Sequence, residues 1–141
     1  MRGARLPKPR PQLEHEVQAD IVKALQSVGF RVKETTAYRQ KGSSGVDKGI
    51  ADLLVFHRVF QVGECLCIEV KRPGPIKFSS PEQELAYRED EFYVAQSVEE
   101  ALIAARWYLM SVSARPYCYT DSSRMIQRID NFLAEWRRGS R

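Results

Sequence analysis

Cysteine is scarce in this chain of 141 residues. There are three cysteines, an odd number, and the Cys65-x-Cys67 spacing is too close for a zinc knuckle. No pair of His or Cys follows at a fitting distance, and the positions match no disulfide framework. The pattern argues against a disulfide scaffold and against structural zinc, so we expect reduced, partly buried thiols.

Long apolar runs are also lacking. No stretch approaches the ~18 residues that a membrane-spanning helix needs, and the basic N-terminus has no apolar core of a signal peptide. The composition, 43% hydrophobic and 28% charged, is that of a globular chain long enough for one domain. We therefore expect a soluble protein of the cytoplasm.

Basic residues gather at the two ends of the chain, whose net charge is +4. Before the first acidic residue stand Arg2, Arg5, Lys8 and Arg10, and near the end stand Arg137, Arg138 and Arg141. Residues 1–12 also hold three prolines, so we expect a basic, Pro-rich extended arm there and a single domain over 13–141. Such ends suit nucleic acid, although solvated tails that only keep the protein soluble would have the same composition.

Apolar periodicity predicts the first half of the fold. Leu13, Val17, Ile21 and Leu25 recur every four residues, which indicates a helix that ends at Gly29. Strands are predicted at 30–38, 51–56 and 64–71, with a glycine-rich loop over 40–49. Because the last two of these strands are joined by a short turn, we expect them to be antiparallel.

The second half predicts a helix, a strand and two more helices. Ser80 caps a helix that runs to about Glu89, a short strand follows at 92–95, and Ser97 caps the next helix. The last helix is amphipathic, and its apolar stripe is Met125, Ile129, Phe132, Leu133 and Trp136. The expected fold is α/β, a mixed sheet of about four strands flanked by helices, with the strand at 92–95 returning as a crossover partner.

Charged side chains stand at the ends of two neighbouring apolar strands. Glu69 and Lys71 are two residues apart, so they leave the second strand on the same face. Asp52 begins the preceding strand, and an antiparallel hairpin would bring it beside them. The simpler interpretations are a turn aspartate and a surface ion pair.

Two converging carboxylates repel each other unless a cation joins them. A hard divalent ion with oxygen ligands, Mg²⁺ or Mn²⁺, suits such a site. Lys71 could then meet a phosphate or hold an attacking water, as hydrolysis of a phosphodiester requires. Glu14 and Gln18 share one face of the first helix. The helix dipole by itself would also favour a carboxylate at Glu14, on the first turn. Glu16 competes with Glu14 for any functional role.

Four short motifs, in this order, resemble one nuclease family. They are Glu14…Gln18, Gly45…Gly49-Ile-Ala-Asp52, Glu69-Val-Lys71 and Ser80-Pro-Glu-Gln83. Together they resemble the VRR-NUC domain, a branch of the PD-(D/E)XK nuclease superfamily, over about residues 13–105. The resemblance implies a restriction-endonuclease-like core.

The resemblance also implies roles for single residues. The catalytic set would be Asp52, Glu69, Lys71, Gln83 and Glu14. The metal, Mg²⁺ or Mn²⁺, would be bound by Asp52, Glu69, the backbone carbonyl of Val70, and Glu14, directly or through water. Lys71 would position the nucleophilic water, and Gln83 would support the lysine or the phosphate, although a capping box with Ser80 also explains Gln83. We expect Lys48 to contact nucleic acid together with the cations of the arm.

The function implied is a Mg²⁺-dependent endonuclease that hydrolyses DNA, with branched or structured DNA as substrate and a homodimer as the assembly. Ala51 departs from the family by replacing its proline, and the segment from Gln83 to Phe92 is shorter than the family's. One alternative is a non-catalytic nucleic-acid-binding module with the same fold, which would be marked by loss of Asp52, Glu69 or Lys71. Another is a structural protein with coincidental motifs and no affinity for divalent metals.

Overall fold

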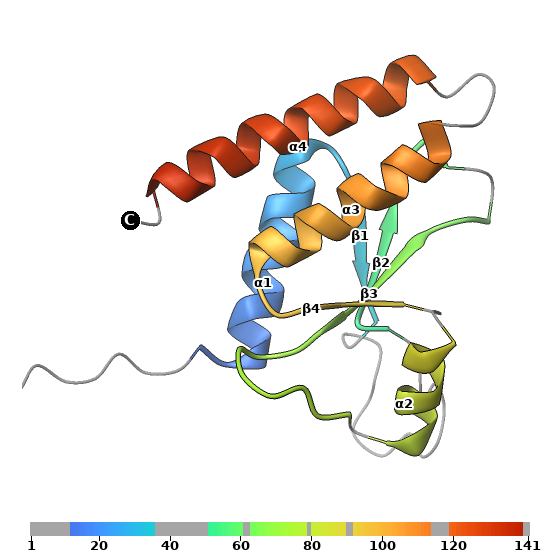
Figure 1. Ribbon diagram of the computed structural model, residues 1–141, viewed down its shortest axis with the longest axis vertical. Helices are drawn as coiled ribbons and strands as arrows, with labels where there is room; N and C mark the ends of the chain where they lie inside the picture. The colour runs from blue at the N-terminus through green and yellow to red at the C-terminus, as the bar shows by residue number, and fades with distance from the viewer. Residues whose placement is uncertain are drawn as a thin grey trace, which may run out of the picture.

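The computed structural model describes residues 12–35, 51–60, 63–78, 80–89, 92–113 and 119–139. In these ranges the chain forms, in order, α1 (Glu14–Val28), β1 (Arg31–Glu34), β2 (Leu53–Phe56), β3 (Leu66–Val70), α2 (Pro81–Arg88), β4 (Tyr93–Ala95), α3 (Val98–Ser113) and α4 (Tyr119–Gly139) (Figure 1). The predicted order of helices and strands is confirmed. The strands are shorter than predicted: β1 ends at Glu34 and β2 begins at Leu53, directly after Asp52.

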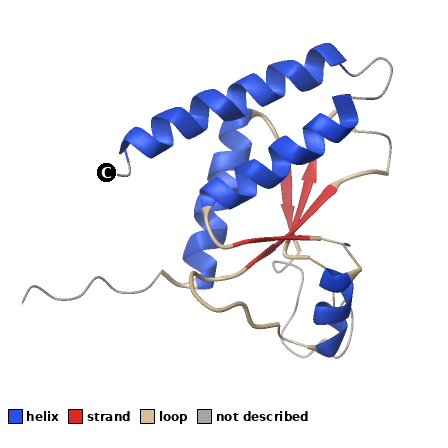
Figure 2. Ribbon diagram, in the orientation of Figure 1, coloured by secondary structure: helices blue, strands red, loops and turns tan. Residues whose placement is uncertain are grey.

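The four strands, drawn in red in Figure 2, form one mixed sheet. Their order in the sheet is β1-β2-β3-β4. The first three are antiparallel to their neighbours, whereas β4 is parallel to β3. A parallel partner needs a crossover connection, and here the crossover contains α2, as predicted. The fold is therefore mixed α/β, a four-stranded mixed sheet flanked by helices.

The main core lies between one face of the sheet and three helices. α3 and α4 lie side by side above the sheet, with α1 beside them (Figure 1). Fully buried side chains come from each of these layers, among them Leu25, Leu53, Ile68, Leu102 and Ile129. Their burial stabilises the fold by roughly 1.5–3 kcal/mol per large aliphatic side chain.

The opposite face of the sheet carries α2 and a small second cluster. Ala51, Ala86 and Phe92 are buried there, and Cys67 packs against them. Since side chains alternate along β3, Glu69 and Lys71 lie on the same side as Cys67, beneath α2. This helix therefore covers the charged end of the strand.

Helix ends follow the sequence closely. Gly29 ends α1 in a left-handed conformation, with φ 112°, which glycine adopts without steric cost. The Ser97 side chain accepts a hydrogen bond of 3.1 Å from the Glu100 N–H at the start of α3. Both caps were predicted.

Several predictions concern residues outside the described ranges, namely the arm over 1–11, the loop over 40–49 and Cys118. Within the described ranges Cys65 and Cys67 are partly buried thiols, as predicted. No helix in the described part of the chain is long and apolar enough to cross a membrane.

Candidate active site

Asp52 and Glu69 lie side by side at one end of the β2–β3 hairpin. The register pairs Leu53 with Ile68, so the next position in each strand puts Asp52 opposite Glu69. The Asp52 N–H donates to Glu69 Oε2 at 3.2 Å, and the Val70 N–H donates to Asp52 Oδ2 at 2.9 Å. Both acidic residues are buried, with 4% and 2% of their surface exposed, so the hairpin holds two carboxyl groups together away from bulk water.

Lys71 and Gln83 complete the group. Lys71 Nζ lies 3.6 Å from Glu69 Oε1 and donates to Gln83 Oε1 at 3.0 Å. The Gln83 amide in turn donates to Glu69 Oε1 at 2.7 Å. The four side chains therefore form one buried network, which we call the acidic cluster: Asp52, Glu69, Lys71 and Gln83.

The lysine of the cluster is held from two further directions. The Lys71 N–H donates to the Ala95 carbonyl at 3.0 Å, which extends the parallel pairing of β3 and β4 by one residue. Its ammonium lies 5.7 Å from the centre of the Phe78 ring, within the range of a cation–π interaction. Only 7% of Lys71 is exposed, unlike a lysine in a surface ion pair.

The electrostatics of the cluster centre on Glu69. Burial, the charge of Asp52 and a hydrogen bond between the two carboxyl groups raise the pKa of Glu69 to about 8, and the Lys71 charge offsets part of this rise. One ammonium does not balance two buried carboxylates. The site therefore favours either a proton or an additional cation.

Gln83 owes its position to the start of α2. Ser80 Oγ accepts a hydrogen bond of 3.2 Å from the Gln83 N–H, and Pro81 occupies the first turn. The predicted cap at Ser80 is therefore present. The Gln83 side chain reaches Lys71 and Glu69, so the cap fixes the backbone from which this amide extends.

Thr35 was not anticipated as part of the site. Its N–H donates to the Asp52 carbonyl at 2.9 Å, and its hydroxyl donates to the Ala51 carbonyl at 2.8 Å. Thr35 therefore fixes the backbone just before β2. In the sequence it stands 16 residues from Ala51 and carries no local signal of this contact.

Glu14 does not join the acidic cluster. It is exposed on the first turn of α1, while Gln18 on the same helix donates to Glu34 at 3.0 Å. Across the described residues no group of three or more His, Cys, Asp or Glu side chains is placed to hold a metal. Metal binding by Glu14 and by the Val70 carbonyl stays a prediction, and Arg2, Arg5, Lys8, Arg10 and Lys48 lie outside the described ranges.

Comparisons of the chain with protein-family models, with curated proteins and with solved structures found no match.

Proposed function

We propose that this protein is a metal-dependent endonuclease that hydrolyses phosphodiester bonds in DNA, built on a restriction-endonuclease-like core. The observation that carries the proposal is the acidic cluster: two buried carboxyl groups, one ammonium and one amide, joined by hydrogen bonds at the end of a hairpin. Burying charged groups in this way costs free energy, and such groups cluster at functional sites. The four members match the motifs that resemble the VRR-NUC domain.

The donor set of the cluster fits Mg²⁺ or Mn²⁺. Asp52 and Glu69 offer hard oxygen ligands, and Mg²⁺ commonly binds proteins through one or two carboxylates while retaining several waters. A divalent cation would replace the proton that Glu69 otherwise keeps, since metal binding requires the deprotonated carboxylate. When bound, the metal would supply Lewis-acid polarisation and neutralise phosphate charge.

Lys71 is the group of this chain suited to act on the reacting atoms. An ammonium has three donor hydrogens and no lone pair, so Lys71 can hydrogen-bond to an attacking water or to a phosphate oxygen and cannot itself ligate a metal. Its donors are already aimed at Glu69 and Gln83, which fixes the ammonium before substrate arrives. Such preorganisation is what stabilises charge that develops in a transition state.

Gln83 is a positioning residue in this proposal. Its carbonyl accepts from Lys71 and its amide donates to Glu69, so one side chain sets the spacing between the ammonium and a carboxylate. Thr35 has a similar effect on the backbone of Asp52. Neither residue needs to touch the substrate.

A cleavage assay tests the proposal. Purified protein would be incubated with linear, nicked, flapped and four-way-junction DNA, with Mg²⁺ or with EDTA, beside Asp52→Asn and the exposed-surface control Glu82→Gln. We expect Mg²⁺-dependent cleavage by the wild type and by Glu82→Gln, and none by Asp52→Asn. Binding without cleavage under every condition would establish the non-catalytic module instead.

The preference for branched DNA and the homodimer rest on the family resemblance. Strongest cleavage of flapped or junction DNA in the same assay would support the substrate class, and equal rates on plain duplex would contradict it. Light scattering at micromolar concentration should give twice the mass of one chain. A monomer there would remove the dimer from the proposal.

A further inference from the structure

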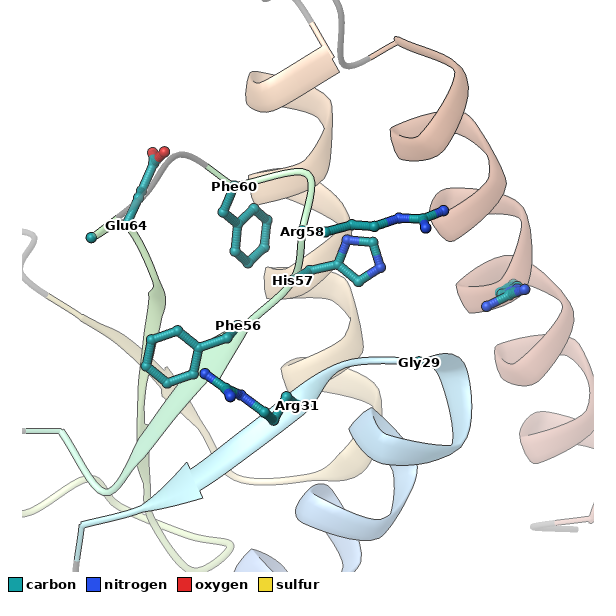
Figure 3. Close-up of a pocket in the computed structure, with 9 residues that line it drawn as sticks. Gly29, Arg31, Phe56, His57, Arg58, Phe60 and Glu64 are labelled. Atoms are coloured by element: carbon teal, nitrogen blue, oxygen red, sulfur yellow. The ribbon is translucent and has the colours of Figure 1, made fainter.

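A second polar site lies at the end of the sheet opposite the acidic cluster. It is a pocket of about 720 Å³ whose described lining residues are Gly29, Arg31, Phe56, His57, Arg58, Phe60, Gly63, Glu64 and Arg128 (Figure 3). We propose that this pocket binds the phosphate group of a nucleotide unit, either free or within a nucleic-acid strand. The inference does not depend on the proposed nuclease activity.

Three elements each bring one arginine to the pocket. Arg31 begins β1, Arg58 follows β2, and Arg128 lies on α4. In Figure 3 the Arg58 side chain extends from the end of β2 toward α4, while Arg31 lies across the ring of Phe56. Three arginines around one pocket, with Glu64 as the one described carboxylate in its lining, give the pocket a local positive field that favours an anion.

Among the described residues, two of these arginines have no carboxylate partner. No ion pair in the described part of the chain involves Arg31 or Arg128. Arg58 pairs with Asp121 at 3.4 Å, but both side chains are well exposed, and such pairs contribute little. The guanidinium donors of Arg31 and Arg128 therefore remain available to a ligand.

The one described carboxylate that lines the pocket is already engaged. The Tyr108 hydroxyl donates to Glu64 Oε1 at 2.8 Å, and Figure 3 shows Glu64 at the side of the pocket away from Arg58. Gly29 contributes through its small size: a Cβ there would stand 3.1 Å from Arg128 Nη1. The turn after α1 thus leaves room for the Arg128 guanidinium beside the pocket.

Aromatic rings stand between the cations. The Arg31 guanidinium lies 5.1 Å from the centre of the Phe56 ring, which holds this flexible side chain over the pocket. The His57 ring is also partly exposed, and it packs edge-on against the buried Phe60 ring, whose centre lies 6.3 Å away. Arginine next to the partly exposed rings of Phe56 and His57 suits a phosphate with an attached sugar and base, because bases stack on aromatic rings.

His57 adds a neutral donor to this set. Its Nδ1 accepts a hydrogen bond of 3.2 Å from the Val59 N–H, so the neutral ring carries its proton on Nε2. Burial and the neighbouring arginine Arg58 lower the pKa of His57, while Asp121 opposes this shift. An uncharged His57 can still donate one hydrogen bond to a phosphate oxygen.

The position of the pocket separates it from the reacting atoms of the proposed nuclease. Asp52 precedes β2 and His57 follows it, so an extended strand of about 16 Å lies between the two sites. A phosphate held in the pocket would fix the position of nucleic acid and take no part in bond cleavage. Loss of the pocket should therefore weaken binding and leave the cleavage rate at saturating DNA unchanged.

Binding in EDTA tests the inference directly. Isothermal titration calorimetry would use inorganic phosphate, a nucleoside monophosphate, a short single-stranded oligonucleotide and a poly-glutamate peptide. The proteins would be wild type, Arg31→Ala, Arg128→Ala and the control Lys23→Ala, an exposed cation of α1 outside the pocket. Each pocket arginine is exposed, so thermal melting should show all four proteins equally folded.

We expect phosphate-bearing ligands to bind the wild type and Lys23→Ala alike, and to bind each arginine variant about tenfold more weakly, the scale of one lost charge-assisted hydrogen bond. Equal affinity for the nucleoside monophosphate and the oligonucleotide would identify free nucleotide as the source. Much tighter oligonucleotide binding would identify nucleic acid.

Unchanged phosphate affinity in both arginine variants, or tighter binding of the peptide, would overturn the proposal. All four proteins keep the acidic cluster and binding is read without metal, so failure of the nuclease proposal would not affect this result.

Discussion

The Asp52 N–H donates a hydrogen bond of 3.2 Å to the Glu69 carboxylate, across two strands whose residues stand 17 positions apart. The Val70 N–H returns a bond of 2.9 Å to the Asp52 carboxylate. Each carboxyl group is thus oriented by the backbone of the opposite strand. This reciprocity decides which substitutions can test the chemistry of the site without disturbing the hairpin.

Asp52→Asn should abolish cleavage and leave the hairpin intact. Asparagine keeps an acceptor for the Val70 N–H but removes the charge that a divalent cation needs. Asp52→Ala should also abolish cleavage, but it leaves a buried N–H unpaired and should lower the free energy of unfolding by about 1–3 kcal/mol. Cleavage assays and urea unfolding of both variants check this. Wild-type activity in Asp52→Asn would remove the residue from the site.

Lys71→Ala should lose cleavage on the order of 10²-fold or more while retaining Mg²⁺ affinity, because an ammonium donates hydrogen bonds and cannot ligate metal. Lys71→Arg should not restore the rate, since a planar guanidinium cannot fit where a compact ammonium lies between Glu69 and Gln83. Single-turnover cleavage beside a metal titration separates the two effects. Near-normal turnover would leave Lys71 as a structural lysine, and lost metal affinity would require a different ligand set.

Gln83→Ala should lower the single-turnover rate about tenfold at saturating Mg²⁺ and DNA, because Lys71 and Glu69 lose their shared partner. The DNA concentration for half-maximal rate should stay unchanged, which a general loss of structure would not produce. Gln96→Ala is the matched control, since that amide donates to the Arg72 and Gly74 carbonyls outside the acidic cluster. Equal rates for the two variants would contradict a positioning role for Gln83.

Glu69 should make the metal-free protein less stable as pH rises. The unfolded chain releases this proton near the ordinary pKa of 4.5, whereas burial, the Asp52 charge and the carboxyl–carboxyl hydrogen bond raise the native pKa of Glu69 to about 8. Between these values the native state binds more protons than the unfolded state, so the free energy of unfolding falls with rising pH and levels off above about 8.

Glu69→Gln removes this titration. We therefore compare the free energy of unfolding of Glu69→Gln with that of the wild type. The value for Glu69→Gln minus the value for the wild type should increase by roughly a few kcal/mol between pH 5 and pH 8. Urea unfolding in EDTA at pH 5, 6.5 and 8 measures it, with Glu82→Gln as an exposed control. A difference that does not vary with pH would show that Glu69 titrates normally.

The N-terminal arm should add affinity for nucleic acid that depends steeply on salt. Deleting residues 1–11 removes Arg2, Arg5, Lys8 and Arg10, so the slope of log K against log salt should become shallower for DNA binding. Fluorescence anisotropy at several salt concentrations measures the slope. An identical slope for the truncated and full-length chains would assign the arm to solubility alone.

The sequence determined the order of the elements and the pairing of Asp52 with Glu69. These features depend on short-range patterns: a period of four in α1, alternation along β3, and a short turn that forces β2 and β3 into an antiparallel hairpin. The same alternation places Glu69 and Lys71 on one face. Local chemistry was therefore enough to find the centre of the candidate site.

The partners of that centre were decided by the tertiary structure. The Gln83 side chain could cap α2 or reach Lys71, and the position of α2 over the sheet decides between the two. The hydrogen bond from the Thr35 N–H to the Asp52 carbonyl likewise depends on pairing between distant strands. Glu14 shows the converse, because a shared helix face with Gln18 did not bring it to Asp52 and Glu69. Arg31, Arg58 and Arg128 likewise line one pocket only once α4 packs beside the turn after β2. Contacts between distant segments are set by packing of the whole core, and no local sequence pattern encodes them.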